Sequence, residues 1–481
     1  MSRSLVGSGQ WSQTTAGILQ PAARLKAKNV VSTGRGVVCY SPVFSYLESR
    51  VIVMRCRRVS LFAGKCLVGF IFATGFAFSS SATCFAQKTE STATAKIENT
   101  TAAKKRLEAL GSSAKVTMDG PKLTEILIQD GSILTADDLA LFGRLSDLTK
   151  LQIYNCRTLN SEMVSNLSGL KELTSLALTN TVIDDSAVET IVKSFPKLTV
   201  LDLSSNANMS SQVLKLIAEL KGLQQLILVQ NRFNELSTRR LTKLQDLRVL
   251  DLRGNMEAGD MTLEVVAALP KLKALKHRST AVSDNGMAYL SNNSTLENLL
   301  IQDFAITNQT GEHLAKLQKL TQLEIFRCQG FGSEGVLALK GLNLQRLTLR
   351  DLPIVDDQAL AVLKDLPKLR RFYLHEISGI TDSGLKNLGS LQVLELLDIW
   401  SIPQMTDSTL DVIATLPNLK ELTIRSTAVT DAAVAKLLAM PKLESLTFKE
   451  NGSVTEAGLK KLSSKKWKKL DVGASSAASE E

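Results

Sequence analysis

The sequence predicts an α/β repeat solenoid, and three observations lead to that class. The phrase L-x-x-L-x-L recurs fourteen times between Leu123 and Lys466, at intervals of 24 or 25 residues. Within each copy the apolar residues alternate, which is the pattern of a β-strand with one buried face. After the strand phrase, leucines such as Leu385, Leu388 and Leu391 are spaced three apart, as in short helical turns.

Each unit therefore consists of one strand and one helical segment, and no unit can bury its apolar face alone. The copies begin at Leu123, Leu148, Leu173, Leu198, Leu223, Leu247, Leu272, Leu296, Leu320, Leu344, Leu369, Leu394, Leu419 and Leu443. Stacked strands lie about 4.8 Å apart, whereas packed helices need roughly 8–10 Å. We therefore expect a curved stack, with a parallel sheet on the concave face and short helices on the convex face.

Polar residues mark the start of the helical segments. The hydroxyl of Thr381 can cap free N–H groups, and Asp382 places an acid near a helix N-terminus. Asp pairs at 137–138, 184–185 and 356–357 recur at the same turn. We interpret these pairs as helix caps and not as general acids.

The phrase ITDSGL at residues 380–385, echoed by VSDNGM and VTEAGL, resembles the cysteine-containing or ITDxGL class of leucine-rich repeats. That class occurs in F-box-linked adaptor proteins and in secreted or envelope proteins of bacteria, planctomycetes among them. The resemblance covers about residues 104–473 and implies a leucine-rich-repeat solenoid with a horseshoe curve. It implies no single function, because such arrays serve unrelated partners.

The class places Asn, Cys or Thr just after the strand, where the side chain bonds backbone groups of neighbouring turns. Here the slot contains Cys156, Thr181, Asn206, Asn231, Asn255, Thr280, Cys328, Thr427 and Asn451. Other residues stand there in five repeats, namely Gly131, Phe304, Leu352, Ile377 and Ile402. His277 is a further departure, because it stands where a strand leucine is expected.

The chain before the repeats contains a predicted export signal. Residues 1–53 show no repeat phase, and we interpret them as a disordered extension or as sequence upstream of a true start at Met54. Residues 54–86 predict a secretory signal peptide, with a basic region, an apolar stretch of twelve residues and small residues before Gln87. A membrane span takes about 20 residues, so a stretch of twelve favours a cleaved signal peptide. An uncleaved signal anchor is the alternative.

The remaining boundaries follow from composition. Residues 87–103 are rich in Thr, Ala and Lys and predict a flexible spacer, and residues 104–122 predict an N-terminal cap. The repeats occupy 123–466, residues 467–473 predict a C-terminal cap strand, and residues 474–481 predict a disordered tail.

The net charge of +10 comes mostly from the leader. Residues 1–86 contain ten Lys or Arg and one Glu, a net charge of +9, which leaves about +1 for the rest of the chain. The basic balance therefore does not indicate a nucleic-acid partner.

The sequence offers little catalytic or metal-binding chemistry. His277, His313 and His375 have no companions at metal-ligand spacing, and no phosphate loop, G-x-S-x-G or H-E-x-x-H motif occurs. Cys156 and Cys328 stand seven repeats apart, about 34 Å along the stack, whereas a disulfide needs α-carbons within about 7 Å. We expect no enzyme activity, no metal, no cofactor and no disulfide in the mature chain.

The outward strand positions form the candidate binding site. The residue after the second strand leucine is mostly small, polar or aliphatic in the first five repeats and becomes Arg or aromatic from the sixth onward. With a neighbouring tyrosine, the candidate binding residues are Arg253, Arg278, Phe326, Arg350, Tyr373, His375, Trp400 and Arg425. Arg, Trp and Tyr are enriched at interface hot spots. The other interpretation is a solvated sheet whose Arg and aromatic residues stack on one another and pair with nearby acids.

Together these features predict an exported, non-catalytic binding scaffold that is secreted, periplasmic or in the cell envelope. A protein or peptide is the first predicted partner, and an envelope glycan stacked on the aromatic residues is the second. We expect no nucleic-acid partner, and membrane attachment only through an uncleaved signal anchor. Two other functions stay open: an intracellular F-box-like adaptor of a ubiquitin ligase, and a structural envelope protein without a specific partner.

Overall fold

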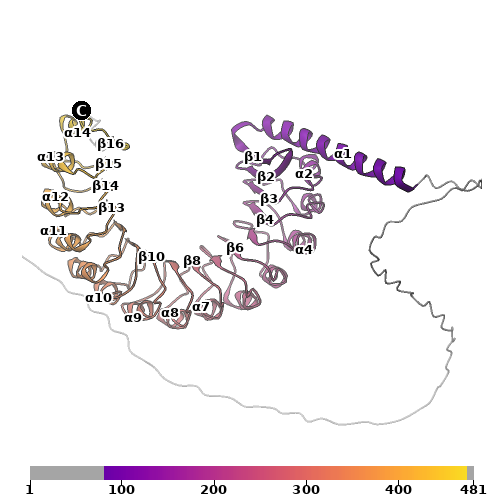
Figure 1. The fold of residues 1–481 in the computed structure, drawn as a ribbon. Helices are drawn as coiled ribbons and strands as arrows, with labels where there is room; N and C mark the ends of the chain where they lie inside the picture. The colour runs from indigo at the N-terminus through magenta and orange to yellow at the C-terminus, as the bar shows by residue number, and fades with distance from the viewer. Residues whose placement is uncertain (1–80, 474–481) are drawn as a thin grey trace, which may run out of the picture. The chain divides into compact units, whose positions relative to one another are not determined.

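Sixteen strands form one continuous sheet in which strand order follows chain order from β1 to β16. The computed structural model describes residues 81–473 of the chain. The first pair, β1 and β2, is antiparallel, and the pairs that follow are parallel. Figure 1 shows the strands on the inner side of the curved stack and the helices on its outer side. The predicted α/β repeat solenoid is therefore confirmed.

The strands are short, from three to seven residues. They are β1 (Ala114–Asp119), β2 (Lys122–Ile128), β3 (Lys150–Tyr154), β4 (Ser175–Thr179), β5 (Val200–Asp202), β6 (Gln225–Ile227), β7 (Val249–Asp251), β8 (Ala274–Arg278), β9 (Asn298–Gln302), β10 (Gln322–Phe326), β11 (Arg346–Arg350), β12 (Arg371–His375), β13 (Leu396–Trp400), β14 (Glu421–Arg425), β15 (Ser445–Lys449) and β16 (Lys469–Gly473).

One α- or 3₁₀-helical segment, or two in succession, follows each repeat strand. The α-helices are α1 (Ser81–Ala109), α2 (Ala136–Phe142), α3 (Ser161–Ser165), α4 (Asp185–Ser194), α5 (Val213–Ile217), α6 (Glu235–Thr238), α7 (Asp260–Ala267), α8 (Asp284–Leu290), α9 (Gln309–Ala315), α10 (Ser333–Leu337), α11 (Asp382–Leu385), α12 (Asp407–Ala414), α13 (Ala432–Ala439) and α14 (Glu456–Leu462). The 3₁₀ helices are η1 (Gly111–Ser113), η2 (Arg239–Lys243), η3 (Asp357–Asp365) and η4 (Lys386–Ser390).

A single hydrophobic core runs through the stack from Ala103 to Leu462. The strand phrases align in register, so that Leu323, Leu347 and Phe372 lie opposite one another on neighbouring strands and are all buried. Because each repeat contacts mainly its neighbours, the stability of the array depends on the interfaces between repeats.

The two aspartates of the pair at 356–357 bond to different repeats. Asp356 accepts a hydrogen bond from the Gln358 N–H at 3.0 Å and caps the following helix, as predicted. Asp357 instead accepts bonds from the N–H (2.7 Å) and hydroxyl (2.6 Å) of Thr381 in the next repeat. The second aspartate of the pair is therefore a cross-link between repeats, and the prediction that both are caps is wrong for this one.

The same cross-link recurs along the C-terminal repeats. Asp382 accepts from the Thr406 N–H at 2.9 Å, and Asp407 accepts from the Thr430 N–H at 2.9 Å. The ITD phrase thus has a structural cause: its threonine caps its own helix and bonds the aspartate of the preceding repeat.

The N-terminal end of the stack differs from the prediction. Residues 87–103, predicted to be a flexible spacer, are part of helix α1, because Ala103 is buried in the core and Lys96 pairs with Asp147 at 2.7 Å. The predicted extension at 1–53, the signal peptide before Ser81 and the tail at 474–481 lie outside the described residues.

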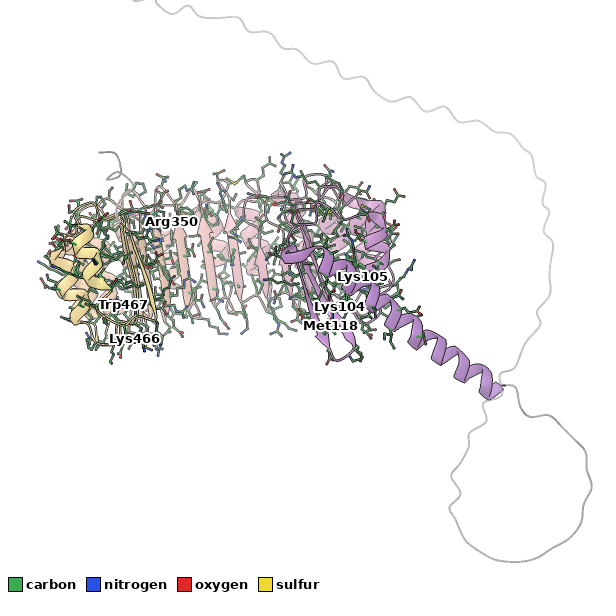
Figure 2. The ribbon with its side chains drawn as sticks, turned by 90° about the horizontal axis from the view of Figure 1, so that it is seen from above. Lys104, Lys105, Met118, Arg350, Lys466 and Trp467 are labelled. Carbon is green, nitrogen blue, oxygen red and sulfur yellow. The ribbon has the colours of Figure 1, made fainter. Side chains whose placement is uncertain are left out.

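Helix α1 covers the first end of the stack, and the segment around Trp467 closes the second. Arg106 of α1 pairs with Asp138 of the first repeat at 2.6 Å, and at the other end the Trp467 indole donates to the Leu462 carbonyl at 2.7 Å. Figure 2 shows Lys104 and Lys105 near the first end and Lys466 with Trp467 at the second.

Within residues 81–473, no helix combines the length and apolar character that crossing a bilayer requires.

The polar slot after the strands binds backbone groups of adjacent repeats. Asn206 is fully buried, donates to the carbonyls of Leu178 (2.8 Å) and Leu203 (2.9 Å), and accepts from the Thr181 N–H (3.0 Å). This ladder of side chains replaces hydrogen bonds that the curved backbone cannot make with itself.

In the seventh repeat the slot belongs to a different residue from the one predicted. Thr280 is exposed, whereas Ser279 is fully buried and its hydroxyl donates to the Met256 carbonyl at 2.8 Å. The one-residue shift coincides with the unusual strand β8, in which His277 occupies the leucine position.

His277 is fully buried between two carbonyl oxygens. Its Nε2 lies 2.7 Å from the Ala258 oxygen, and its Nδ1 lies 3.3 Å from the Leu252 oxygen. A neutral imidazole has one N–H, so it can donate to only one of these oxygens. Burial disfavours the charged ring and lowers the pKa of His277 below its usual value of 6.5.

This burial predicts a pH dependence of stability. As pH falls through about 6.5, His277 is protonated in the unfolded chain but stays neutral in the folded one, so the unfolded state binds more protons. Its contribution to the free energy of unfolding is therefore complete above the unfolded pKa and decreases as pH falls towards the folded pKa. We expect His277→Leu to flatten the decline in stability between about pH 7 and pH 5. Urea unfolding of both proteins across this range measures the slope, and parallel curves would contradict the expectation.

Candidate functional site

Five of the predicted binding residues form one row across the concave sheet. In register, Phe326 lies opposite Arg350, Arg350 opposite His375, His375 opposite Trp400, and Trp400 opposite Arg425. We call these five residues the concave ladder. Because each is the last residue of its strand, the ladder lies along one margin of the sheet, where Figure 2 labels Arg350.

Arg350 is the centre of the ladder. Its guanidinium carbon lies 4.5 Å from the ring centroid of Phe326 and 5.1 Å from that of Trp400. Its Nε donates to Glu376 Oε2 at 2.7 Å. Two aromatic contacts and one ion pair fix the orientation of a side chain that stays 34% exposed.

Arg425 continues the ladder on the far side of Trp400. Its guanidinium carbon lies 5.3 Å from the Trp400 centroid, and its Nη2 donates to Glu450 Oε1 at 2.7 Å. Hydrogen bonds from Arg425 and Ser426 lower the pKa of Glu450, so this carboxylate is charged at neutral pH.

His375 contacts both Trp400 of the ladder and Tyr373, the middle residue of strand β12. The His375 ring meets Trp400 edge-on at 5.7 Å and Tyr373 at 6.0 Å between centroids. His375 Nε2 lies 3.1 Å from Asp398 Oδ1 but does not meet hydrogen-bond geometry. This contact becomes an ion pair only when the imidazole is protonated.

The other two predicted arginines lie outside the aromatic cluster. Arg278 ends β8, with Gln302 between it and Phe326 in the register. Arg253 follows β7 and forms a bidentate pair with Asp251, whose hydrogen bonds raise the pKa of the guanidinium. The structure therefore groups five of the eight predicted residues in the ladder, places Tyr373 beside it and separates these two.

The acids that pair with the arginines occupy the same position in their repeats, directly after the strand. Glu376, Glu450 and Asp303 each follow a strand and have left-handed φ angles of 56°, 57° and 59°. Each pairs with an arginine of the preceding repeat, Asp303 with Arg278 at 2.5 Å. A left-handed non-glycine residue costs about 1–2 kcal/mol. The repeat geometry fixes this conformation, which directs the acid back across the previous strand.

Sequence reasoning missed residues that face the same side as the ladder. Arg327 also lies over the Phe326 ring at 4.5 Å, and Arg346 stacks on Tyr373 at 4.6 Å. Asp398 lies beside His375. Side chains on a strand alternate, so the first and third strand positions face the same way as the fifth. Applying that rule to every strand would have found Arg346 and Asp398.

The stacking and ion pairs of the ladder are those that the solvated-sheet interpretation expects. At the same time, Figure 1 shows no element over the inner face of the sheet in the part of the chain that is drawn as ribbon. The ladder is thus a preorganised but uncovered row of aromatic and charged groups. Partner binding by these residues stays a prediction.

Metal or thiol chemistry finds no support among residues 81–473. No group of three or more His, Cys, Asp or Glu side chains in this range could hold a metal ion. Cys156 and Cys328 are free and buried, and burial raises the pKa of Cys328 to about 12. A thiol in this state is protonated and unreactive at neutral pH.

The fold and the open sheet define a repeat scaffold. Proteins of this class have an extended concave surface that can bind other proteins. The chain belongs to the leucine-rich repeat region family, whose match covers residues 182–477, more than half of its length. No curated protein sequence matches the chain.

Many solved structures resemble the chain, and two of them illustrate the likeness. The crystal structure of an internalin (inlF) from Listeria monocytogenes is 21% identical, covers 68% of this chain and 86% of its own, and has a TM-score of 0.48. The yeast Rad7 and Elc1 complex is 18% identical, covers 81% of this chain and 92% of its own, and has a TM-score of 0.49. At these values the two structures say nothing about the function of this chain.

Proposed function

We propose that this protein is an exported, non-catalytic leucine-rich-repeat scaffold that binds a protein or peptide through the concave face of its C-terminal repeats. The observation that carries the proposal is the stack of Phe326, Arg350 and Trp400 on an uncovered sheet. Arg and Trp are the residue types that supply most binding energy at interfaces. Side chains already held in place lose little rotamer entropy when a partner binds.

Arg350 keeps donors available for a partner. Its Nε is used by Glu376, whereas its two terminal nitrogens form no hydrogen bond with any residue between 81 and 473. These nitrogens can donate in parallel to a carboxylate or to backbone carbonyls of a peptide. Trp400 and Phe326 supply apolar area beside them, so the ladder combines an anchor and a polar contact.

Export rests on the leader sequence. Basic residues precede the apolar stretch 67–78, and small residues precede Gln87. The ITD phrases are compatible with export, because the repeat class that they resemble occurs in bacterial secreted proteins as well as in F-box-linked adaptors. We expect N-terminal sequencing of the mature protein to find a chain that starts near Gln87. An intact leader on a protein that stays inside the cell would contradict export and favour the adaptor alternative.

The binding surface can be tested by capture from the producing cells. We expect wild type to retain a protein or peptide, and the double variant Arg350→Glu, Trp400→Ala to retain at least about tenfold less, because two hot-spot side chains are lost. Affinity capture with mass spectrometry measures both. The matched control is Gln129→Glu with Tyr154→Ala, which changes the same strand position in the first two repeats.

Each outcome of the capture test is informative. Capture that the control retains and the double variant loses would support the ladder as the contact surface. Equal capture by wild type and the double variant would exclude the ladder. Retention of an envelope polysaccharide in place of a protein would favour the glycan alternative.

A further inference from the structure

Two arginines without acid partners among residues 81–473 lie at the margin of the concave sheet opposite the ladder. Arg346 is the first residue of β11 and Arg371 the first residue of β12, and the register places them directly opposite each other. Arg350 ends the same strand as Arg346, about 13 Å away. The ladder arginines have acid partners, so the two margins differ in electrostatic character.

The contacts of these arginines leave their charge uncompensated. The Arg346 guanidinium stacks on Tyr373 at 4.6 Å, and neither Arg346 nor Arg371 forms an ion pair or a side-chain hydrogen bond with a residue of the described range 81–473. Like charges directly opposite on neighbouring strands are destabilising. Arg370, which directly precedes Arg371 in the chain, pairs with Glu395 at 2.7 Å.

The three arginines surround one hollow. Its volume is about 240 Å³, and its lining consists of Gln322, Gln345, Arg346, Arg370, Arg371 and Glu395. We call it the basic hollow. Three cations and one anion give the lining a net charge of +2, and the two glutamine amides add neutral donors.

A second hollow adjoins the first on the concave face. It measures about 310 Å³ and shares Gln322 and Arg346 with the basic hollow. Lys276 and Glu324 lie in its wall, and their opposite charges cancel in the sum over the lining. Because Arg370 pairs with Glu395, the net positive charge of the two hollows comes from Arg346 and Arg371.

We infer that the basic hollow binds an oxyanion, a phosphate or a carboxylate group. Guanidinium groups present forked N–H donors that match both. An anion between Arg346 and Arg371 would replace their mutual repulsion by two attractive contacts. The inference does not rest on the proposed function, because a free oxyanion can occupy the hollow without a protein partner.

The test uses the full chain in low-salt Tris-chloride buffer, with inorganic phosphate and glutarate as probes. Phosphate is expected to raise the thermal unfolding midpoint of wild type in a saturable manner, because a ligand of the folded state stabilises it. Isothermal titration is expected to show that Arg346→Gln with Arg371→Gln weakens binding at least about tenfold. Without an added anion this variant should unfold no earlier than wild type, since the repulsion is gone.

Two variants separate the hollow from general electrostatic attraction. Glu395→Gln removes the acid of the lining and should tighten phosphate binding. Lys460→Gln with Lys466→Gln removes the same two charges as the double variant from exposed positions in the last repeat and should leave binding unchanged. A loss in this control equal to that of the double variant would overturn the inference, since binding would then follow net charge alone.

The two probes identify the source of the oxyanion. Response to phosphate alone assigns the hollow to a phosphate group, and response to glutarate assigns it to carboxylates such as acidic side chains. No midpoint shift of wild type with either probe, or a shift that the double variant retains in full, would overturn the inference. Neither result bears on the capture test, whose variants lie in the ladder.

Discussion

Replacing Asn206 with alanine should lower the free energy of unfolding by about 3–5 kcal/mol, one of the two largest effects expected in this protein. The buried amide serves Leu178, Leu203 and Thr181 at once. Removing it takes the side-chain partner from the Leu178 carbonyl and from the N–H and hydroxyl of Thr181, and each unsatisfied group costs about 1–3 kcal/mol. The Leu203 carbonyl keeps a hydrogen bond from Asn231 Nδ2 at 2.8 Å. The loss would fall at the interface between the third and fourth repeats, where one repeat stabilises the next.

Urea denaturation followed by circular dichroism measures this effect. Asn208→Ala is the matched control, because Asn208 is exposed and donates one hydrogen bond to the Val182 carbonyl at 3.2 Å. Its substitution should change stability by less than about 0.5 kcal/mol. A denaturation midpoint for Asn206→Ala equal to that of the control would show that water replaces the amide, and that the polar slot after the strands is not a source of stability.

The period of the sequence was sufficient to predict the strands and their register. Because every repeat has nearly the same length, residues at equal phase lie opposite each other, as Phe326, Arg350 and His375 do. The alternation of apolar residues also predicted which face is buried. These predictions depend on local spacing alone, and therefore the structure confirms the fold class.

The pairing of arginines with acids could not be derived from the same spacing. Glu376 is adjacent in sequence to His375 but contacts Arg350 of the preceding repeat. That contact depends on the left-handed backbone of Glu376, and alternation rules describe extended chain only. The same limit explains why the second aspartates, such as Asp357, were assigned to caps.

Helix α1 shows a different limit of sequence reasoning. Its composition of Thr, Ala and Lys suggested a flexible spacer, and its own amphipathic pattern is weak. The order comes from tertiary contacts, namely Ala103 and Leu107 in the core and Arg106 on Asp138. Packing of this kind overrides local propensity, and only the structure reveals it.

The distribution of charge sharpens the functional proposal. At the ladder margin each arginine already has an acid, so a partner gains apolar area and a few directed hydrogen bonds from Arg350 and Trp400. At the opposite margin Arg346 and Arg371 have no acid, and a partner gains electrostatic attraction. A peptide that runs along the strands would meet both margins, with its acidic groups towards the basic hollow.

Gly143→Ala is the second substitution with a large expected effect. Gly143 ends helix α2, where the next repeat packs closely against the backbone. A β-carbon at this position would collide with the carbonyl oxygen of Asn166, closer than the 3.0 Å that real β-carbons respect. The obstacle is backbone, so the second repeat must shift as a unit, and we expect a loss of about 3 kcal/mol or more.

Gly222→Ala provides the matched control for this collision. Gly222 also lies between a helix and the next strand, but no atom lies within 4 Å of its added β-carbon. There alanine should be neutral or stabilise by about 0.4–1 kcal/mol, because it restricts the unfolded chain. Hydrogen exchange would localise the difference, with Gly143→Ala increasing exchange in the first two repeats before the rest of the stack. If both variants unfold at the wild-type midpoint, the interface between these repeats accommodates a methyl group, and close packing there does not limit stability.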